Sequence, residues 1–228
     1  MWVIEAIIEL LKENMQMLSR ETVNTLYMTL VSSIVAYILA LPLGIALVVT
    51  KEDGLHPMGL LYRILDIAVN IGRSVPFLIL LVAIQPLTTF IVGKSYGSTA
   101  TIVPLVVAST PFIARLIESS LQEVDHGVIE AAQSMGASLS TIILKVLIPE
   151  AKTSLIVGGT IAIGTILSYS AMAGFVGGGG LGDIATRYGY YRYQADIMII
   201  TVILMVILIQ LLQLIGMKIA RKTDKRAI

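Results

Sequence analysis

The sequence contains no cysteine, only two histidines and one tryptophan, and few charged residues, 14% of 228. Without cysteine the chain can form neither a disulfide nor a thiolate metal site. Soluble domains carry about 25% charged residues, whereas this chain is 56% hydrophobic and has a mean hydropathy of +0.88. The composition therefore predicts a polytopic membrane protein. A net charge of +1 gives no indication of a nucleic-acid partner.

Several signatures of catalysis and ion coupling are also missing. There is no G-x-x-x-x-G-K-[ST] phosphate loop and no H-E-x-x-H, which argues against an ATPase and a zinc peptidase. His56 and His126 fall in predicted loops, so neither is expected to be buried beside a serine. This argues against an intramembrane enzyme. Ion-coupled transporters usually place acidic residues near the middle of the membrane. The sequence has no acidic residue between Glu21 and Glu52 or between Asp196 and Lys218, which argues against an ion-coupled transporter.

Stretches with little or no charge predict an all-α fold with five transmembrane helices, because a bilayer core takes roughly 20 apolar helical residues. Asp66 and Arg73 fall in the first half of the second span, which leaves its boundaries open. An odd number of spans places the two termini on opposite sides. The expected spans are residues 22–50, 64–86, 97–114, 153–172 and 197–217.

Basic residues in the loops predict a cytoplasmic C-terminus and an external N-terminus. Ten basic residues then lie inside and five outside, with Arg73 counted as intramembrane. The inside set is Lys51, Arg63, Arg115, Lys145, Lys152, Lys218, Arg221, Lys222, Lys225 and Arg226, and the outside set is Lys12, Arg20, Lys94, Arg187 and Arg192. We expect a transmembrane domain over residues 22–218, with a cytoplasmic loop at 115–152, and a basic tail at 219–228.

Residues 1–21 precede the first span. Glu5 and Glu9 stand four residues apart on one face of a helix and leave an apolar face opposite. We therefore expect an interfacial amphipathic helix, with a frayed tail as the alternative.

The 115–152 loop carries the most informative pattern. Glu130, Ala131 and Ala132 favour a helix that starts near Val124 or Asp125. Gly136 suits the left-handed position after a helix end. Ser138 and the pair Pro149-Glu150 favour a second helix leading into the fourth span. The pattern predicts two short helices with alanines on an exposed face; an ordinary amphipathic loop helix is the alternative.

The same residues resemble the signature of bacterial ABC importer permeases: Glu-Ala-Ala, three residues, Gly, nine residues, then Ile-x-Leu-Pro. Glu130, Ala131, Ala132, Gly136 and Pro149 match it, while Val146 and Ile148 are mild departures. Further segments from about residue 22 to 217 resemble the methionine importer permeases, although Gly72 stands where a bulkier Phe is common. Those segments are Thr22–Leu30, Asn70–Phe77, Pro111–Arg115 and Tyr169–Gly174 with the glycines to Gly182.

The resemblance implies an ABC type I importer fold in the bacterial cytoplasmic membrane. It implies that the Glu-Ala-Ala helix couples to a separate ATPase, and that an extracytoplasmic binding protein delivers methionine, as the L or D isomer or a derivative. One motif per chain against a paired ATPase implies two copies of each subunit. No cofactor is implied. Another amino acid or a small polar solute is the alternative substrate.

Three residues are candidates for the pathway or its gate. Tyr169 and Met172 are three apart and share a helical face; plain packing is the alternative. Arg73 would be costly inside the membrane, so we expect it to face the subunit interior or the subunit interface, paired with Asp66 or Glu118, or else to reach the cytoplasmic edge.

The chain between the last two spans is rich in glycine and tyrosine. Gly177, Gly179 and Gly182 match G-x-G-x-x-G, but they follow a membrane helix and not a strand. We therefore expect a flexible external turn. The tyrosines near Arg187 and Arg192 favour an anchor at the membrane interface, with binding-protein contact as the alternative. They are Tyr188, Tyr190, Tyr191 and Tyr193.

Overall fold

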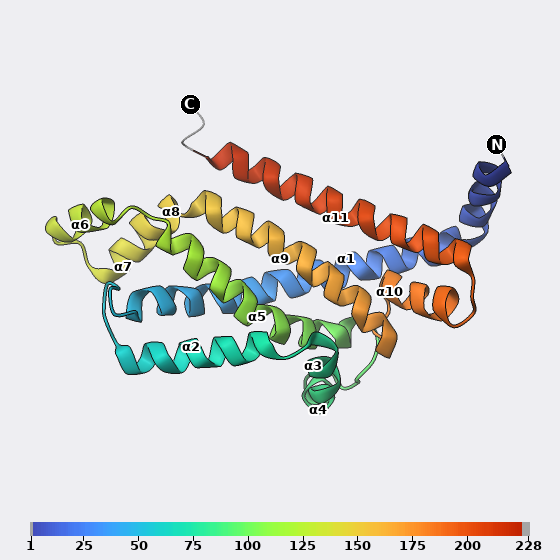
Figure 1. The fold of residues 1–228 in the computed structure, drawn as a ribbon, viewed down its shortest axis with the longest axis horizontal. Coiled ribbons are helices and arrows are strands. Elements are labelled where there is room, and N and C mark those ends of the chain that lie inside the picture. The colour runs from blue at the N-terminus through green and yellow to red at the C-terminus, as the bar shows by residue number, and fades with distance from the viewer. Residues whose placement is uncertain (1, 225–228) are drawn as a thin grey trace. The chain divides into compact units, whose positions relative to one another are not determined.

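The computed structural model describes the backbone of residues 2–224 and the side chains of residues 14–224. Within that range every regular element is helical, so the predicted all-α class is confirmed (Figure 1). The elements are α1 (Trp2–Thr50), α2 (Gly59–Ser74), α3 (Phe77–Ala83), α4 (Gln85–Val92), α5 (Ser98–Gln122), α6 (His126–Ser134), α7 (Leu139–Ile142), η1 (Ile143–Leu147), α8 (Ile148–Glu150), α9 (Lys152–Ala173), η2 (Gly174–Val176), α10 (Gly180–Ile184), η3 (Ala185–Tyr190) and α11 (Ala195–Thr223).

Four helical stretches of the described chain are long and apolar enough to cross a membrane, and α2 with α3 makes a fifth only as a bent pair. The second predicted span was therefore wrong as one straight helix. The chain bends by 100° at Val75-Pro76, where both residues are extended, with ψ of 123° and 132°. Proline disfavours helical geometry in the residue before it and donates no backbone N–H, which explains the break.

Two other helix boundaries differ from those expected. Helix α5 runs on to Gln122, so residues 115–122 are helix and not loop. Helix α1 is continuous through residues 21 and 22. The amphipathic prediction for residues 1–21 depends on Glu5 and Glu9, whose side chains lie outside the described residues, as does the end of the basic tail at 225–228.

The chain divides into two compact units, and the four longest helices contribute to both. Unit 1 contains Met1–Ser33, Pro76–Val107 and Ile163–Leu212. Its core includes a cluster of Leu18, Ile184, Ile197 and Ile200, which joins the first half of α1 to α10 and α11. Burial of such aliphatic side chains is the main stabilising term in a helical unit.

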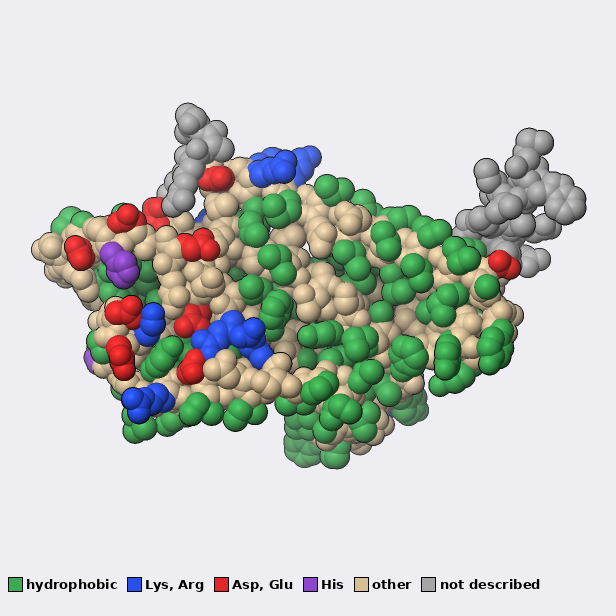
Figure 2. Space-filling model, viewed as in Figure 1, with side chains coloured by type: hydrophobic (Ala, Val, Ile, Leu, Met, Phe, Trp, Pro, Cys, Tyr) green, Lys and Arg blue, Asp and Glu red, His purple; other side chains and the backbone are tan. Residues whose placement is uncertain are grey.

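Unit 2 contains Ile34–Val75, Ala108–Ala162 and Gln213–Ile228. Small residues bring its helices close together: a Cβ on Gly44 would lie 2.7 Å from Ile117, and one on Gly216 would lie 2.2 Å from the Thr160 hydroxyl. Glycine is therefore required where α1 crosses α5 and where α9 crosses α11. Over unit 2, Figure 2 shows acidic and basic side chains gathered around α6 and α2.

Candidate functional site

Helix α6 follows α5 after only three residues, Glu123 to Asp125. The Asp125 carboxylate caps its start by accepting a hydrogen bond of 2.7 Å from the backbone N–H of Gly127. Val124 in the connection is buried. The expected helix start is confirmed, and α6 is joined directly to a predicted membrane-spanning helix.

The end of α6 is closed by its own backbone. Gly136 has φ of +73°; its N–H donates to the Gln133 carbonyl at 2.9 Å, and the Ala137 N–H donates to the Ala132 carbonyl at 3.1 Å. This pair of bonds is the Schellman arrangement. Ser138 then caps α7 by accepting from the N–H of Thr141 at 3.4 Å. The predictions of Gly136 as the left-handed residue after a helix end and of Ser138 as a helix cap are confirmed.

The exposed face of α6 differs from the one expected. Ala131 is exposed, but Ala132 is buried, because successive helical residues point about 100° apart. Val128, Ala131 and Met135 instead share the exposed side, with Met135 81% exposed. Glu130 and Gly136 are exposed too. An apolar stripe on an exposed helix is typical of a surface that another protein covers.

Pro149 lies exposed in the first turn of α8. The helix before it contains a π-helical turn, η1, that sequence reasoning missed. A proline at 149 has no N–H to donate to the carbonyl four residues earlier, which favours local rearrangement of the helical bonding. Such turns are frequent at functional sites.

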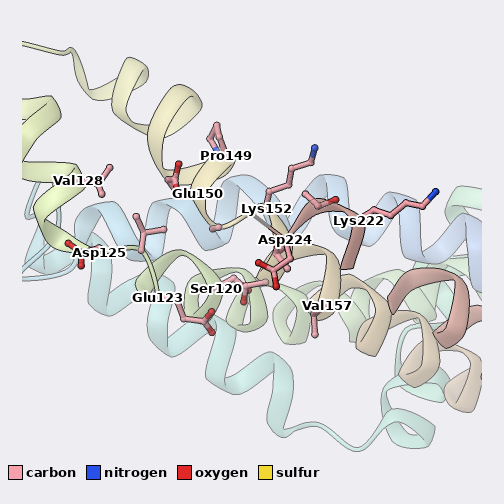
Figure 3. A pocket seen from close by; sticks show the side chains of 15 residues that line it. Ser120, Glu123, Asp125, Val128, Pro149, Glu150, Lys152, Val157, Lys222 and Asp224 are labelled. Atoms are coloured by element: carbon pink, nitrogen blue, oxygen red, sulfur yellow. The ribbon is translucent and has the colours of Figure 1, made fainter. Parts of the chain in front are cut away.

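Two polar cavities adjoin α6 within unit 2. The larger holds about 750 Å³ and is lined by the end of α5, the α6 cap, α8, the start of α9 and the end of α11 (Figure 3). The smaller, about 490 Å³, separates α6 from the turn at residues 51–55. Asp53 lies in that turn, and its pKa is held below the ordinary value. The larger cause is a hydrogen bond from the backbone of Asp53, and the next is a hydrogen bond from the Lys51 side chain.

Arg73 lies exposed in the last turn of α2. The expected pairing with Asp66 or Glu118 is wrong, because both carboxylates pair with Arg115. None of the ion pairs among the described residues involves Arg73. Sequence reasoning missed Arg115 because it stood at the edge of a predicted loop.

Tyr169 and Met172 both lie on α9, in the part of that helix that belongs to unit 1. Their helical conformation agrees with the prediction that they share a helical face. Tyr169 is half-buried, and its ring stacks on Phe77 of α3, with centroids 4.6 Å apart and planes inclined by 3°. Met172 is more exposed. Phe77 is therefore a further member of this aromatic group, and only its place directly after Pro76 marks it in the sequence.

The glycine-rich segment is closely packed and is not the flexible turn expected. Gly174, Gly178, Gly180, Gly182 and the helix α10 are buried. A Cβ on Gly174 would lie 2.2 Å from the backbone of Gly182, so these glycines permit backbone-to-backbone packing. The glycines were interpreted as a source of backbone flexibility, whereas in the structure they allow two backbone segments to pack closely.

Side chains of α1 hold the start of α10. Glu21 accepts a hydrogen bond from the Gly180 N–H, and the Thr25 hydroxyl accepts one from the Leu181 N–H, each at 2.8 Å. Both groups would otherwise be unpaired N–H donors at a helix start. The nearby tyrosines divide: Tyr188 packs against the Leu18 cluster with Arg192 over its ring at 4.6 Å, while Tyr190, Tyr191 and Tyr193 are exposed.

Comparison with known proteins gives concordant matches. The family described as "Binding-protein-dependent transport system inner membrane component" matches residues 40–227. A Vibrio cholerae protein named probable D-methionine transport system permease protein MetI is 52% identical over 213 residues, covering 93% of this chain and 95% of that protein. The methionine import system permease protein MetP of Bacillus subtilis is 43% identical, covering 79% and 81%.

A solved structure is also similar to this chain. It is titled "Inward facing conformations of the MetNI methionine ABC transporter" and aligns with a TM-score of 0.92 and 45% identity, covering 93% of this chain and 99% of that one. The ABC importer permease fold is thereby confirmed. This chain belongs to the family of binding-protein-dependent transport system inner membrane components, and it is a multi-pass membrane protein.

Proposed function

We propose that the chain is the permease subunit of an ATP-driven methionine importer and hydrolyses no ATP itself. The observation that carries this is α6, an exposed helix with an apolar stripe, capped at both ends and joined to a membrane-spanning helix. Such a helix suits a groove on a separate motor protein. Methionine is the substrate in the names of the V. cholerae and B. subtilis relatives.

The partners of this function are two ATPase subunits, a second copy of this chain and an extracytoplasmic binding protein. Glu130, Ala131, Ala132, Gly136 and Pro149 form the coupling segment, with Ala132 supporting it from the buried side. Tyr169 and Met172 gate the pathway, and Arg73 lies beside it. ATP closure of the motors draws the coupling helices together and opens the pathway outward, an alternating-access cycle.

The experiment is uptake of labelled methionine into proteoliposomes that hold the chain, its ATPase and its binding protein. We expect uptake that requires ATP and is reduced by unlabelled L- or D-methionine. Preference for another amino acid in the competition assay would replace methionine as the substrate and keep the importer. Uptake driven by an ion gradient without ATPase would contradict the proposal.

The domain limits belong to the same proposal. Residues 1–21 form an external interfacial segment whose end packs on the permease domain through Leu18 and Glu21. Residues 22–218 form the permease domain, and residues 219–228 form a cytoplasmic basic tail. Arg115 lies within α5, but many of the other counted basic residues also lie in helices, so the count stays ten inside against five outside. That bias still favours a cytoplasmic C-terminus.

A further inference from the structure

A charged network joins α2 to α5 inside unit 2. The Arg115 guanidinium donates to Glu118 at 2.6 Å, to Asp66, and to the Asn70 side-chain oxygen at 3.0 Å. The Asn70 amide donates in turn to Asp66 at 3.2 Å. The Glu118 and Arg115 side chains are only 8% and 19% exposed, so solvent screens the network poorly.

Two helices are thus tied by one side chain. Asp66 and Asn70 belong to α2, and Arg115 and Glu118 to α5. A second contact lies along the same pair, where a Cβ on Gly72 would be 3.2 Å from the Cβ of Pro111. Since Gly72 follows Asp66 and Pro111 precedes Arg115, the two helices run antiparallel.

The position of the network along α5 gives it a mechanical meaning. Arg115 and Glu118 lie in the last two turns of α5, and α6 begins four residues after that helix ends. A displacement of α6 therefore reaches α5 directly. Helix α2 continues into the break at Val75-Pro76 and then into Phe77, whose ring stacks on Tyr169.

We propose that Arg115 is a positioning residue that clamps α2 to α5, so that α2 moves together with the coupling helix during transport. The inference rests on the proposed function and adds a connection from the coupling helix to the aromatic gate. An arginine suits this place because its planar fork holds three acceptors at once, which a lysine ammonium on a flexible stem does not.

The absence of cysteine allows a direct test. The pair Gly72→Cys and Pro111→Cys lies close to disulfide distance, so oxidation would replace the clamp with a covalent bond. The complex with ATPase and binding protein is reconstituted, and methionine transported per ATP hydrolysed is measured. Variants are R115Q, R115K and the cysteine pair, reduced and oxidised, with and without R115Q. R187Q, which removes the Asp183–Arg187 ion pair of unit 1, is the matched control.

R115Q and R115K are expected to lower the transport ratio about fivefold or more, the lower end of typical coupling between sites. R187Q should leave the ratio unchanged. Oxidation of the cysteine pair should restore most of the ratio in R115Q and preserve uptake in the otherwise wild-type chain. A normal ratio in R115Q, or an oxidised pair that blocks wild-type uptake, would overturn the clamp.

Spin labels separate this inference from the choice of substrate. Labels replace Ile67 on α2 and Ser119 on α5, both exposed. The distance between them should be the same in nucleotide-free and ATP-trapped complexes, whatever solute is carried. A changed distance would refute the clamp even where methionine uptake is normal. A constant distance without methionine uptake would support the clamp and reject the substrate.

Discussion

Gly136 allows the coupling turn to be tested at a single residue. Its φ of +73° costs residues with a Cβ roughly 1–2 kcal/mol, whereas no atom beyond the adjoining residues lies within 4 Å of the position a Cβ would take. Gly136→Val should therefore strain only the backbone, misplace α6 and lower transport per ATP, while membrane insertion is retained. The measurement is uptake and ATP hydrolysis in proteoliposomes.

Two variants control this prediction. Gly136→Asn should keep more of the activity, because asparagine tolerates the left-handed region better than valine. Gly93→Val places the same strain at the end of α4, where φ is +80° and space is also open. Equal loss from the valine variants at 136 and 93 would point to general destabilisation and remove the coupling role of the turn.

Tyr169 and Met172 are tested through leak. Tyr169→Ala removes the stack on Phe77, a contact worth about 0.5–1.5 kcal/mol beyond its area. With Met172→Ala it should raise substrate-independent ATP hydrolysis or passive methionine leak. Tyr169→Phe keeps the ring and should behave as wild type. Tight vesicles and an unchanged basal rate in the double variant would mean that the two side chains only pack.

At the scale of elements, the start of α10 depends on α1. Thr25→Val keeps the shape of the side chain but removes the hydroxyl that accepts from Leu181 N–H. Loss of such a cap costs about 0.5–2 kcal/mol, so thermal unfolding in detergent should begin at a lower temperature. Thr25→Ser retains the hydroxyl and should be close to wild type. If valine and serine give the same midpoint, the bond contributes nothing measurable.

The sequence predicted those elements whose signals are local. Charge-free length located the spans, Asp125 and Ser138 marked helix starts, and Gly136 marked a helix end. The break at Val75-Pro76 was missed because proline occurs in membrane helices both with and without a break. The packing of Gly174 on Gly182 was missed because a glycine leaves the same trace in a flexible turn and in a close contact.

Long-range pairing explains the remaining errors at the candidate site. Arg73 was expected to pair with Asp66 or Glu118, whereas the fold brings Arg115 to both carboxylates. The inward side of Ala132 likewise depends on how α6 rests on the chain beneath it. Neither choice follows from local propensity, because tertiary contacts set both.

For the whole molecule, the single proposed coupling segment per chain predicts a complex with two copies of this 24.5 kDa subunit and two ATPase subunits. Two differently tagged copies of the chain, expressed together with the ATPase, should be recovered together on either tag, and capture on both tags in sequence should yield them in equal amounts. Their ratio to the ATPase is measured by quantitative amino-acid analysis. Recovery of only the captured tag would reject the dimer.

The closure of α6 at both ends also bears on how these transporters choose their motors. Asp125 accepts hydrogen bonds from the first N–H groups of α6, and the N–H groups of Gly136 and Ala137 donate to its last carbonyls. The ends of the helix therefore need few hydrogen bonds from the rest of the protein. A segment of this kind is suited to exchange between permeases. Grafting residues 125–138 from a related permease should redirect the chain to that relative's ATPase without altering the membrane helices. Recombination among transporter operons could exchange the same segment in the same way.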